Sequence, residues 1–193
     1  MRLEQGERIQ EFIVANRLSH CLELGFYHGV SSAYIAGALK GTGRGHLVTI
    51  DLEDSQLLDP NIESVLRTLQ LEEFVTWYYE PTSYNWRLMR LLQANAEPLF
   101  DFCYVDGGHT WCSTGFAFCL VSRLLKSGGW IVFDDLDWTH EDATVRDSQR
   151  VRSMPPDERT APQVRMVYEL LVKRDLSFEN FAVEGQWAFA QKR

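Results

Sequence analysis

The sequence has 193 residues, of which 45% are hydrophobic and 24% are charged, and its formal net charge at pH 7 is −8. This composition suits one folded domain over residues 1–193, and the negative charge argues against a broad surface for nucleic acids or anionic membranes. No apolar run reaches about 18 residues, and the first residues lack the apolar segment of a signal peptide, so we expect a cytoplasmic protein without a transmembrane helix.

The N-terminal segment predicts an amphipathic helix over residues 4–17, because Ile9, Phe12 and Ile13 recur at helical spacing. We expect this helix to pack on the edge of a sheet. The apolar run at 20–24 then predicts the first strand of that sheet.

A glycine turn follows the first strand. Gly25 and Gly29 allow the backbone to turn tightly and a ligand to approach it closely. The helix expected at about 31–39 directs unpaired N–H groups at that ligand, and Ser31 lies in its first turn. A glycine pair alone is also compatible with a turn that binds nothing.

The residues around the turn indicate which ligand it would hold. The dinucleotide pattern Gly-x-Gly-x-x-Gly is incomplete, because Tyr27 stands where its second glycine would be. Glu23 lies at the end of the strand, and a carboxylate there would repel a pyrophosphate but attract an ammonium or sulfonium group. S-adenosyl-L-methionine (SAM) carries both cations, and its carboxylate suits Ser31 and the helix N-terminus.

The run Leu-Glu-Leu-Gly-Phe-Tyr-His-Gly-Val-Ser-Ser-Ala, from residue 22 onward, resembles motif I of class I SAM-dependent methyltransferases of the methyltransferase-24 type. It is particularly similar to the catechol O-methyltransferase kind and to the macrocin O-methyltransferase and cephalosporin hydroxylase-like kind. With later motifs, the resemblance extends over roughly residues 18–137. It implies SAM binding by Glu23, Gly25, Phe26, Tyr27, Gly29 and Ser31.

Asp51 follows the second predicted strand, at 46–50. An acid at the carboxyl end of this strand is expected to bind ribose hydroxyls. That role would serve NAD as well as SAM, so Asp51 supports a nucleoside without choosing between them. The alternative is an acid in a surface turn.

A helix at 62–69 and a third strand at 74–79 follow, both predicted from their apolar patterns. Ser83 lies in the loop after this strand, where it could contact the adenine of SAM. An N-cap for the helix expected near 84–94 is the stronger interpretation.

Three acids follow the next two strands. Asp106 ends the strand at 100–105, and Asp134 and Asp135 end the strand at 130–133. Adjacent parallel strands would bring these acids together at the carboxyl edge of the sheet, beside the cofactor crevice. Crowded carboxylates repel one another unless a cation neutralises them, and oxygen ligands suit Mg²⁺.

The resemblance sharpens this expectation. Related metal-dependent O-methyltransferases place one metal-binding acid after strand four, a pair after strand five, and a base three residues after the first acid. Asp106, the pair Asp134 and Asp135, and His109 match these positions. This implies a Mg²⁺ site at the three acids and His109 as the general base.

Each assignment has an alternative. Asp106 could serve the cofactor alone, Asp135 could cap a helix, and Asp134 could be a solvated strand end. His109 could cap its own helix, expected at about 110–125 and followed by a turn at 127–129. The alternative pocket histidines are His28 and His140, and the aromatic residues that flank the predicted site are Trp111 and Trp138.

The last part of the chain predicts a lid, a helix and a hairpin. Residues 137–160 are polar and charged, and we expect a mobile lid loop there. Thr160 is the expected cap of the next helix. The runs at 176–183 and 186–190 predict a closing antiparallel hairpin.

The four cysteines contain no Cys-x-x-Cys pair, which argues against a zinc cluster. Cys21 and Cys103 fall in strand-like runs, and Cys112 and Cys119 fall in a helical run. We expect all four to be reduced residues in or near the core.

The alternation of strands and helices predicts a three-layer, doubly wound α/β fold of the Rossmann-like kind with a mostly parallel sheet. The resemblance adds seven strands and a C-terminal antiparallel hairpin. It implies Mg²⁺-dependent O-methylation of a small molecule, such as a sugar, a polyketide-type product or a diol. A metal-independent, N-directed methyltransferase and a non-catalytic SAM-binding or nucleoside-binding module are alternatives. The predicted partner is a small-molecule acceptor, and a homodimer is compatible with the sequence.

Overall fold

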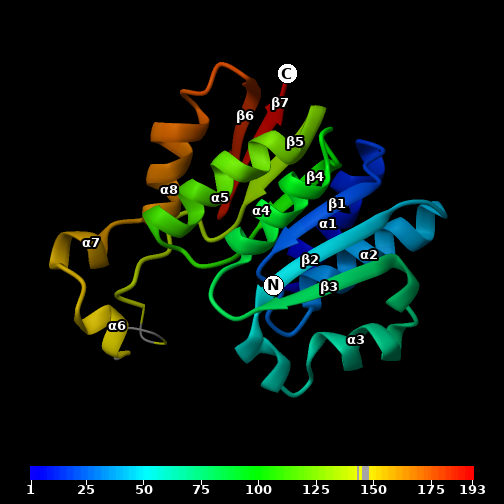
Figure 1. Ribbon diagram of the computed structural model, residues 1–193, viewed down its shortest axis with the longest axis horizontal. Helices are drawn as coiled ribbons and strands as arrows, with labels where there is room; N and C mark the ends of the chain where they lie inside the picture. Colours follow the sequence, from blue (N-terminus) through cyan, green and yellow to red (C-terminus); the bar gives the residue numbers. More distant parts are fainter. Residues whose placement is uncertain (143, 145–147) are drawn as a thin grey trace.

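The computed structural model describes residues 1–142, 144 and 148–193. Its strands form a seven-stranded sheet in the order β3-β2-β1-β4-β5-β7-β6 (Figure 1). The strands are β1 (His20–Leu24), β2 (His46–Leu52), β3 (Val75–Glu80), β4 (Phe100–Val105), β5 (Leu125–Phe133), β6 (Phe178–Glu184) and β7 (Trp187–Lys192). Strands β1 to β5 pair in parallel, and β7 is antiparallel to β5 and β6. The predicted doubly wound sheet with a terminal hairpin is therefore confirmed.

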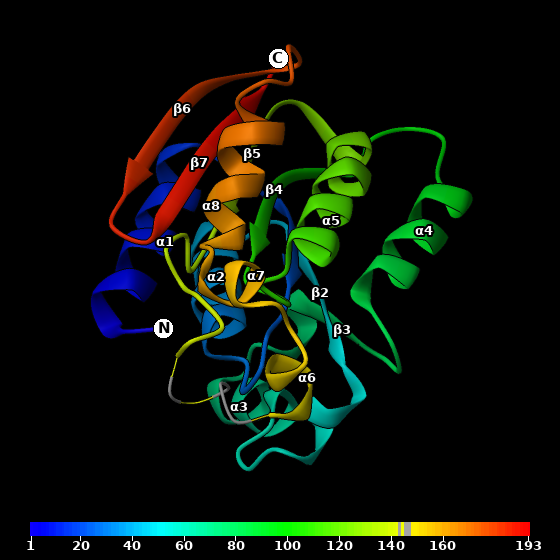
Figure 2. The same ribbon diagram turned by 90° about the vertical axis from the view of Figure 1, so that its left-hand side faces the viewer.

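Helices cover both faces of the sheet (Figures 1 and 2). One face carries α1 (Leu3–Ala15), α2 (Val30–Thr42) and α3 (Ile62–Leu69). The other face carries α4 (Tyr84–Ala94), α5 (Trp111–Leu124) and α8 (Gln163–Val167), and α8 continues as a π-helical turn at Tyr168–Val172. Short 3₁₀ turns lie at Glu53–Leu57 and Glu72–Phe74. No helix of the described residues is long and apolar enough to cross a membrane.

The central strands supply side chains to two cores, one on each face of the sheet. Phe102 and Tyr104 of β4 pack with α1, α2 and α3, whereas Cys103 and Val105 pack with α4, α5 and α8. Side chains alternate between faces along a strand, so a parallel sheet that is covered on both sides needs an apolar residue at nearly every position. This requirement explains the unbroken apolar runs that predicted the strands.

The N-terminal helix lies on a face of the sheet and not on its edge, which corrects the expectation from the sequence. The ring of Phe12 lies 5.3 Å from the ring of Trp130 on β5 and 5.2 Å from the ring of Phe189 on β7, measured between centroids. Because the terminal hairpin extends the sheet beyond β5, this part of the sheet offers an apolar face that α1 covers.

Two predicted boundaries also differ. The residues at 127–129 do not form a turn before β5 but an irregularity within it, because β5 begins at Leu125 and its register with β4 shifts between Phe100 and Phe102. Thr160 ends a short helix, α7 (Pro156–Thr160), and its hydroxyl donates to the carbonyl of Pro156 at 2.9 Å. It therefore does not cap α8.

The cysteines are all free, as expected, but only two are in the core. Cys21 and Cys103 are buried in β1 and β4, whereas Cys112 and Cys119 are exposed on α5. The predicted lid contains α7 and another short helix, α6 (Gln149–Arg152). Ala143 and residues 145–147 of the predicted lid lie outside the described residues.

Candidate active site

Glu23 is fully buried in β1, beneath the glycine turn. Its Oε2 accepts hydrogen bonds from the hydroxyls of Ser32 on α2 and of Thr49 on β2, the latter at 2.6 Å. Its Oε1 is buried and has no hydrogen-bond partner. Burial raises the pKa of Glu23 to about 7, although the hydroxyls of Ser31, Ser32 and Thr49 favour the ionised form. The free Oε1 is therefore an acceptor that a cation would satisfy.

The glycine turn requires glycine at both predicted positions. Gly25 has a φ of +85°, and a Cβ there would collide with the backbone oxygen of Asp106. Gly29 has a φ of +86°, and a Cβ there would lie 2.7 Å from the side chain of Ile62. Left-handed backbone conformations of this kind are accessible to glycine without steric cost. The turn is thus packed directly against the residue that follows β4.

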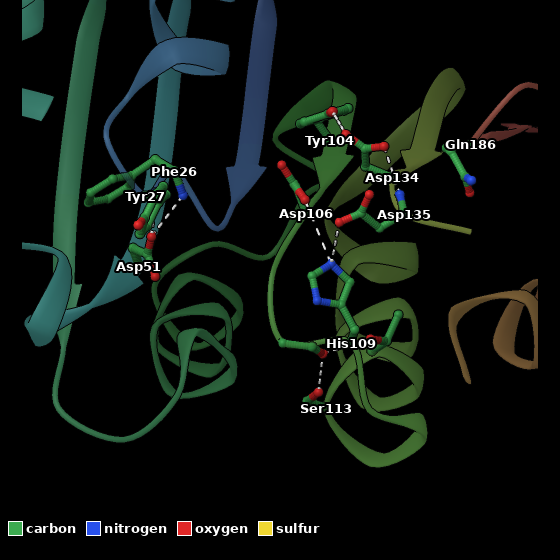
Figure 3. Close-up of polar contacts among 12 residues, drawn as sticks. Phe26, Tyr27, Asp51, Tyr104, Asp106, His109, Ser113, Asp134, Asp135 and Gln186 are labelled. Atoms are coloured by element: carbon green, nitrogen blue, oxygen red, sulfur yellow. Dashed lines mark hydrogen bonds and ion pairs between the residues drawn. The ribbon is translucent and has the colours of Figure 1, made fainter. Parts of the chain in front are cut away.

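Asp51 holds the turn in place (Figure 3). Its Oδ2 accepts hydrogen bonds from the backbone N–H groups of Phe26, at 2.9 Å, and Tyr27, at 2.7 Å. Its Oδ1 accepts from the N–H of Leu52 at 2.7 Å. Asp51, which the sequence predicted to bind ribose, therefore fixes the shape of the loop. Its contact with a ribose stays a prediction.

The other residues predicted to bind the cofactor surround this turn. Phe26 is buried and packs edge-on against Tyr79, whereas Tyr27 is 64% exposed. Ser31 is buried in the first turn of α2. Ser83 caps α4 by accepting a hydrogen bond from the N–H of Asn85 at 3.1 Å, which confirms its predicted role as an N-cap.

A second group of polar side chains converges where β4 and β5 end (Figure 3). His109 Nε2 lies 3.8 Å from Asp106 Oδ1 and 3.3 Å from Asp135 Oδ2. One nitrogen or oxygen atom from each of the three residues lies within 4.8 Å of the others, so together they could hold a metal ion. His109 Nε2 is buried without a well-oriented hydrogen bond.

Backbone hydrogen bonds explain why these residues meet. The N–H of Asp106 donates to the carbonyl of Leu24 at 2.8 Å, and the N–H of Asp134 donates to the carbonyl of Val105 at 3.0 Å. Three adjacent parallel strands therefore end at one level. Asp135 follows with a φ of +54°, a conformation that aspartate tolerates better than most residues.

Asp134 does not face this group, which corrects the expected set of three metal-binding aspartates. Its Oδ2 accepts a hydrogen bond from the buried hydroxyl of Tyr104, and its Oδ1 accepts from the N–H of Asp135 at 2.7 Å. Both carboxylate oxygens of Asp134 are thus engaged, one by Tyr104 and one by the backbone of Asp135. The structure brings Asp106, His109 and Asp135 together instead.

Asp106, His109 and Asp135 form one cluster, in which each charge alters the pKa of its neighbours. Burial and the neighbouring Asp134 raise the pKa of Asp106 to about 6, against the opposing effect of His109. Burial disfavours the imidazolium of His109, but its contacts with Asp106 and Asp135 outweigh burial and raise its pKa to about 9. In the protein without a metal ion, His109 is therefore a cation between two carboxyl groups at neutral pH.

Residues 22–136 match the methyltransferase domain family, a span that includes both the glycine turn and the cluster. The chain belongs to this family. Membership confirms the resemblance to class I SAM-dependent methyltransferases that the sequence indicated, and with it the assignment as an enzyme. No curated protein matches the sequence.

Solved structures of methyltransferases share the fold. An O-methyltransferase from Bacillus cereus in complex with SAH has a TM-score of 0.72 and 20% identity, over 100% of this chain and 82% of the other. The O-methyltransferase TomG from Streptomyces achromogenes, involved in tomaymycin synthesis and in complex with SAM, has a TM-score of 0.71 and 21% identity, over 100% and 81%. SAH-bound methyltransferase PaMTH1 from Podospora anserina has a TM-score of 0.72 and 15% identity, over 100% and 80%.

Sequence reasoning missed two glutamines that hold the chain segments next to Asp135 and His109. The carbonyl of Gln186 accepts from the N–H of Leu136, and its side-chain oxygen accepts from the N–H of Asp137, both at 3.0 Å. Gln163 Oε1 accepts from the N–H of Trp111 at 2.6 Å, at the start of α5. Neither glutamine lies in a motif, so only the tertiary structure identifies them.

Of the alternative histidines and tryptophans, two lie beside the cluster. The ring of Trp138 lies 4.8 Å from the ring of His109 and 4.8 Å from the ring of His140, between centroids. His28 instead contacts the carbonyl of Pro60 through Nδ1 at 2.6 Å, near α3. Trp138 therefore covers one side of His109.

Proposed function

We propose that this methyltransferase transfers the methyl group of SAM to a hydroxyl group of a small molecule, with Mg²⁺ bound at the cluster. One observation carries the proposal: Asp106, His109 and Asp135 converge directly beside the motif I turn, since the backbone of Asp106 packs against Gly25. The methyl donor and the methyl acceptor would thus bind next to each other at one edge of the sheet.

SAM fits the residues around the turn. When bound, it supplies an activated methyl group on a sulfonium leaving group. The unpartnered Oε1 of Glu23 suits a cationic group, and the N-terminus of α2 with Ser31 suits a carboxylate. Asp51 would accept a hydrogen bond from a ribose hydroxyl while it holds the backbone of the loop, and Tyr27 is exposed beside it. The relatives of the same fold that hold SAM or SAH support this assignment.

Mg²⁺ fits the cluster, because hard carboxylate oxygens are its preferred protein ligands and the buried Nε2 of His109 lacks a well-oriented partner. Asp106 and Asp135 would hold the ion. When bound, Mg²⁺ lowers the pKa of a hydroxyl that contacts it. The carboxylate of Asp134 would not contact the ion but would fix the backbone of Asp135 through a hydrogen bond.

His109 is the proposed general base. A Mg²⁺ ion held by Asp106 and Asp135 would oppose protonation of the adjacent imidazole, so His109 would be neutral in the loaded enzyme. Its Nε2 would then take the proton of the acceptor hydroxyl as the oxygen attacks the methyl group in line. The carboxylates of Asp106 and Asp135 stabilise the imidazolium that forms, since they lie 3.8 and 3.3 Å from Nε2. Trp138 packs against the imidazole and restricts its orientation.

One observation favours a second candidate, a metal-independent methyltransferase. His109 already neutralises part of the negative charge of Asp106 and Asp135, so the cluster is electrostatically balanced by protein groups alone. In that case, Asp106 and Asp135 would serve only to orient His109.

Calorimetric titration tests the proposal with SAM and Mg²⁺ as probes. We expect both SAM and Mg²⁺ to bind the wild-type protein. In Asp135→Asn, the heat of Mg²⁺ binding should disappear. The control is Asp54→Asn, which removes an exposed carboxylate outside the site. Absence of SAM binding would overturn methyl transfer. If SAM binds and Mg²⁺ does not, the metal-independent candidate is favoured.

A further inference from the structure

A small cavity of about 230 Å³ lies between His109 and the short helix α6. Its wall comes from three segments, which are the loop before α5, the loop after β5, and α6 with its cap. His109 belongs to this wall, although its Nε2 is directed at Asp106 and Asp135 (Figure 3). The cavity therefore gives a small molecule access to the ring of the proposed general base.

His140 contributes a buried polar atom to this wall. The residue is only 6% exposed, and its Nδ1 has no hydrogen-bond partner among the described residues. The residue is held in place, because its ring packs on Trp138 and its backbone N–H donates to the carbonyl of Arg159 at 3.0 Å. A buried polar atom without a partner costs free energy. Beside a cavity, such an atom points to a ligand that bonds with it.

Arg150 on α6 supplies a positive charge to the same wall. Its exposed guanidinium forms no ion pair or hydrogen bond within the part of the chain that the structure describes. Two neighbouring arginines are paired instead, since Arg159 binds Glu141 and Arg165 Nη2 donates to Asp137 at 2.7 Å. Arg150 is therefore free to bind a ligand in the cavity.

The electrostatic potential in the cavity favours an anion. Burial lowers the pKa of His140, and the charges of Arg150 and His109 lower it further, against the opposing effect of Glu158. The cap of α5, Thr110, also lies in the wall, so the cavity adjoins the positive end of that helix. An anion would be attracted both to Arg150 and to the start of α5.

The size and charge of the cavity match a carboxylate. A guanidinium can hold both oxygens of a carboxylate through paired N–H donors, and one free arginine balances its single charge. Complete sites for small molecules start at roughly 300 Å³, so this cavity suits a group at the end of a molecule. A phosphate is a poorer match, because it would bring more negative charge close to Asp106 and Asp135.

We propose that this cavity binds a carboxylate, and that the carboxylate belongs to the methyl acceptor, which is then a hydroxy acid. Arg150 and His140 would bind the carboxylate, while the hydroxyl lies beside Nε2 of His109. Trp138 contacts both imidazole rings and would line the path between the two groups. The carboxylate takes no part in methyl transfer but positions the hydroxyl. This inference rests on the proposed function, because it assigns the acceptor of the same reaction.

Saturation-transfer NMR measures the carboxylate site without the reaction. The probes are benzoate and 4-hydroxybenzoate, each compared with its neutral primary amide, on the protein without SAM. We expect both acids to bind, and each amide to bind about tenfold more weakly. Equal binding of acid and amide would overturn the inference, and so would the absence of binding by either acid.

A set of arginine variants locates the binding. Arg150→Gln should remove the preference for the acids, a change of about tenfold, and Arg150→Lys should keep part of it because the charge remains. Arg174→Gln is the matched control, since Arg174 is also exposed and forms no ion pair with a described residue. An unchanged preference in Arg150→Gln, or an equal loss in Arg174→Gln, would contradict binding in this cavity.

Turnover separates a carboxylate of the acceptor from a free anion. With SAM and a panel of hydroxybenzoates and hydroxycinnamates, we expect at least one acid to be methylated with a KM about tenfold below that of its methyl ester. Arg150→Gln should raise this KM and leave kcat within about twofold. Binding of benzoate without methylation of any hydroxy acid would assign a free anion to the cavity and overturn the proposed acceptor. Failure of the proposed function is separate, because it shows as absence of SAM binding and leaves the NMR result intact.

Discussion

The glycine turn and the acidic cluster use carboxylates in opposite ways. At the turn, both oxygens of Asp51 accept hydrogen bonds from backbone N–H groups close by. At the cluster, Asp106 and Asp135 face His109 at 3.8 and 3.3 Å, and the histidine nitrogen lacks a well-oriented hydrogen bond. The hydrogen bonds of Asp51 are complete in the free protein and fix a loop. The cluster leaves polar atoms that a ligand can satisfy.

The largest expected effect tests the cluster of Asp106, His109 and Asp135. Asp135→Asn should lower kcat/KM for methyl transfer by about 1,000-fold, because it removes both a ligand of the proposed Mg²⁺ and a partner of His109. Its affinity for SAM should stay within about twofold of the wild-type value, as judged by calorimetry. Asp54→Asn is the control for activity. Equal loss of SAM affinity and of turnover would show that the two regions are not separate.

The next effect tests Glu23, the buried acid below the turn. Its pKa is about 7 in the folded protein, above that of an unfolded glutamate, so the folded state binds a proton more tightly. Its contribution to stability is therefore most favourable below the unfolded pKa and is lost as the pH rises through about 7.

Glu23→Gln removes this ionisation. From pH 5 to pH 8, the free energy of unfolding of the variant should rise relative to that of the wild type by up to about 3 kcal/mol. Urea unfolding at the two pH values measures this difference, with the exposed Glu97→Gln as the control. A constant difference would mean that Glu23 ionises in the folded protein as an exposed acid does.

A smaller effect tests Asp51 at the glycine turn. Asp51→Ala should weaken SAM binding by about tenfold, because it removes both the proposed ribose contact and the acceptor of the Phe26 and Tyr27 N–H groups. Calorimetry with SAM measures the change, and Asp54→Ala is the matched control. Unchanged affinity would assign Asp51 no part in binding.

The smallest effect separates two roles of Ser83. As an N-cap of α4, it should contribute about 1 kcal/mol to stability, so Ser83→Ala lowers the free energy of unfolding by that amount. Ser83→Asn keeps a capping side chain and should restore most of it. A loss of SAM affinity in both variants would instead point to contact with the adenine.

The two regions also differ in how well the sequence predicts them. The turn lies within one continuous stretch, and local chemistry predicted its glycines, its helix and the neighbouring acid. The cluster needs two strand ends, and the order of parallel strands predicted that Asp106 and Asp135 would meet. The direction of Asp134 depends on Tyr104 in the neighbouring strand, and the supports Gln163 and Gln186 come from later in the chain. No local pattern records such contacts.

The contact between Arg8 and Glu184 joins the helix at one end of the chain to the hairpin at the other. Both residues lie outside the span 22–136 that matches the methyltransferase domain family. A chain cut back to that span would therefore lose this ion pair together with α1, β6 and β7. The apolar face of β5 that α1 covers, and the edge of β5 that pairs with β7, would then be exposed to water.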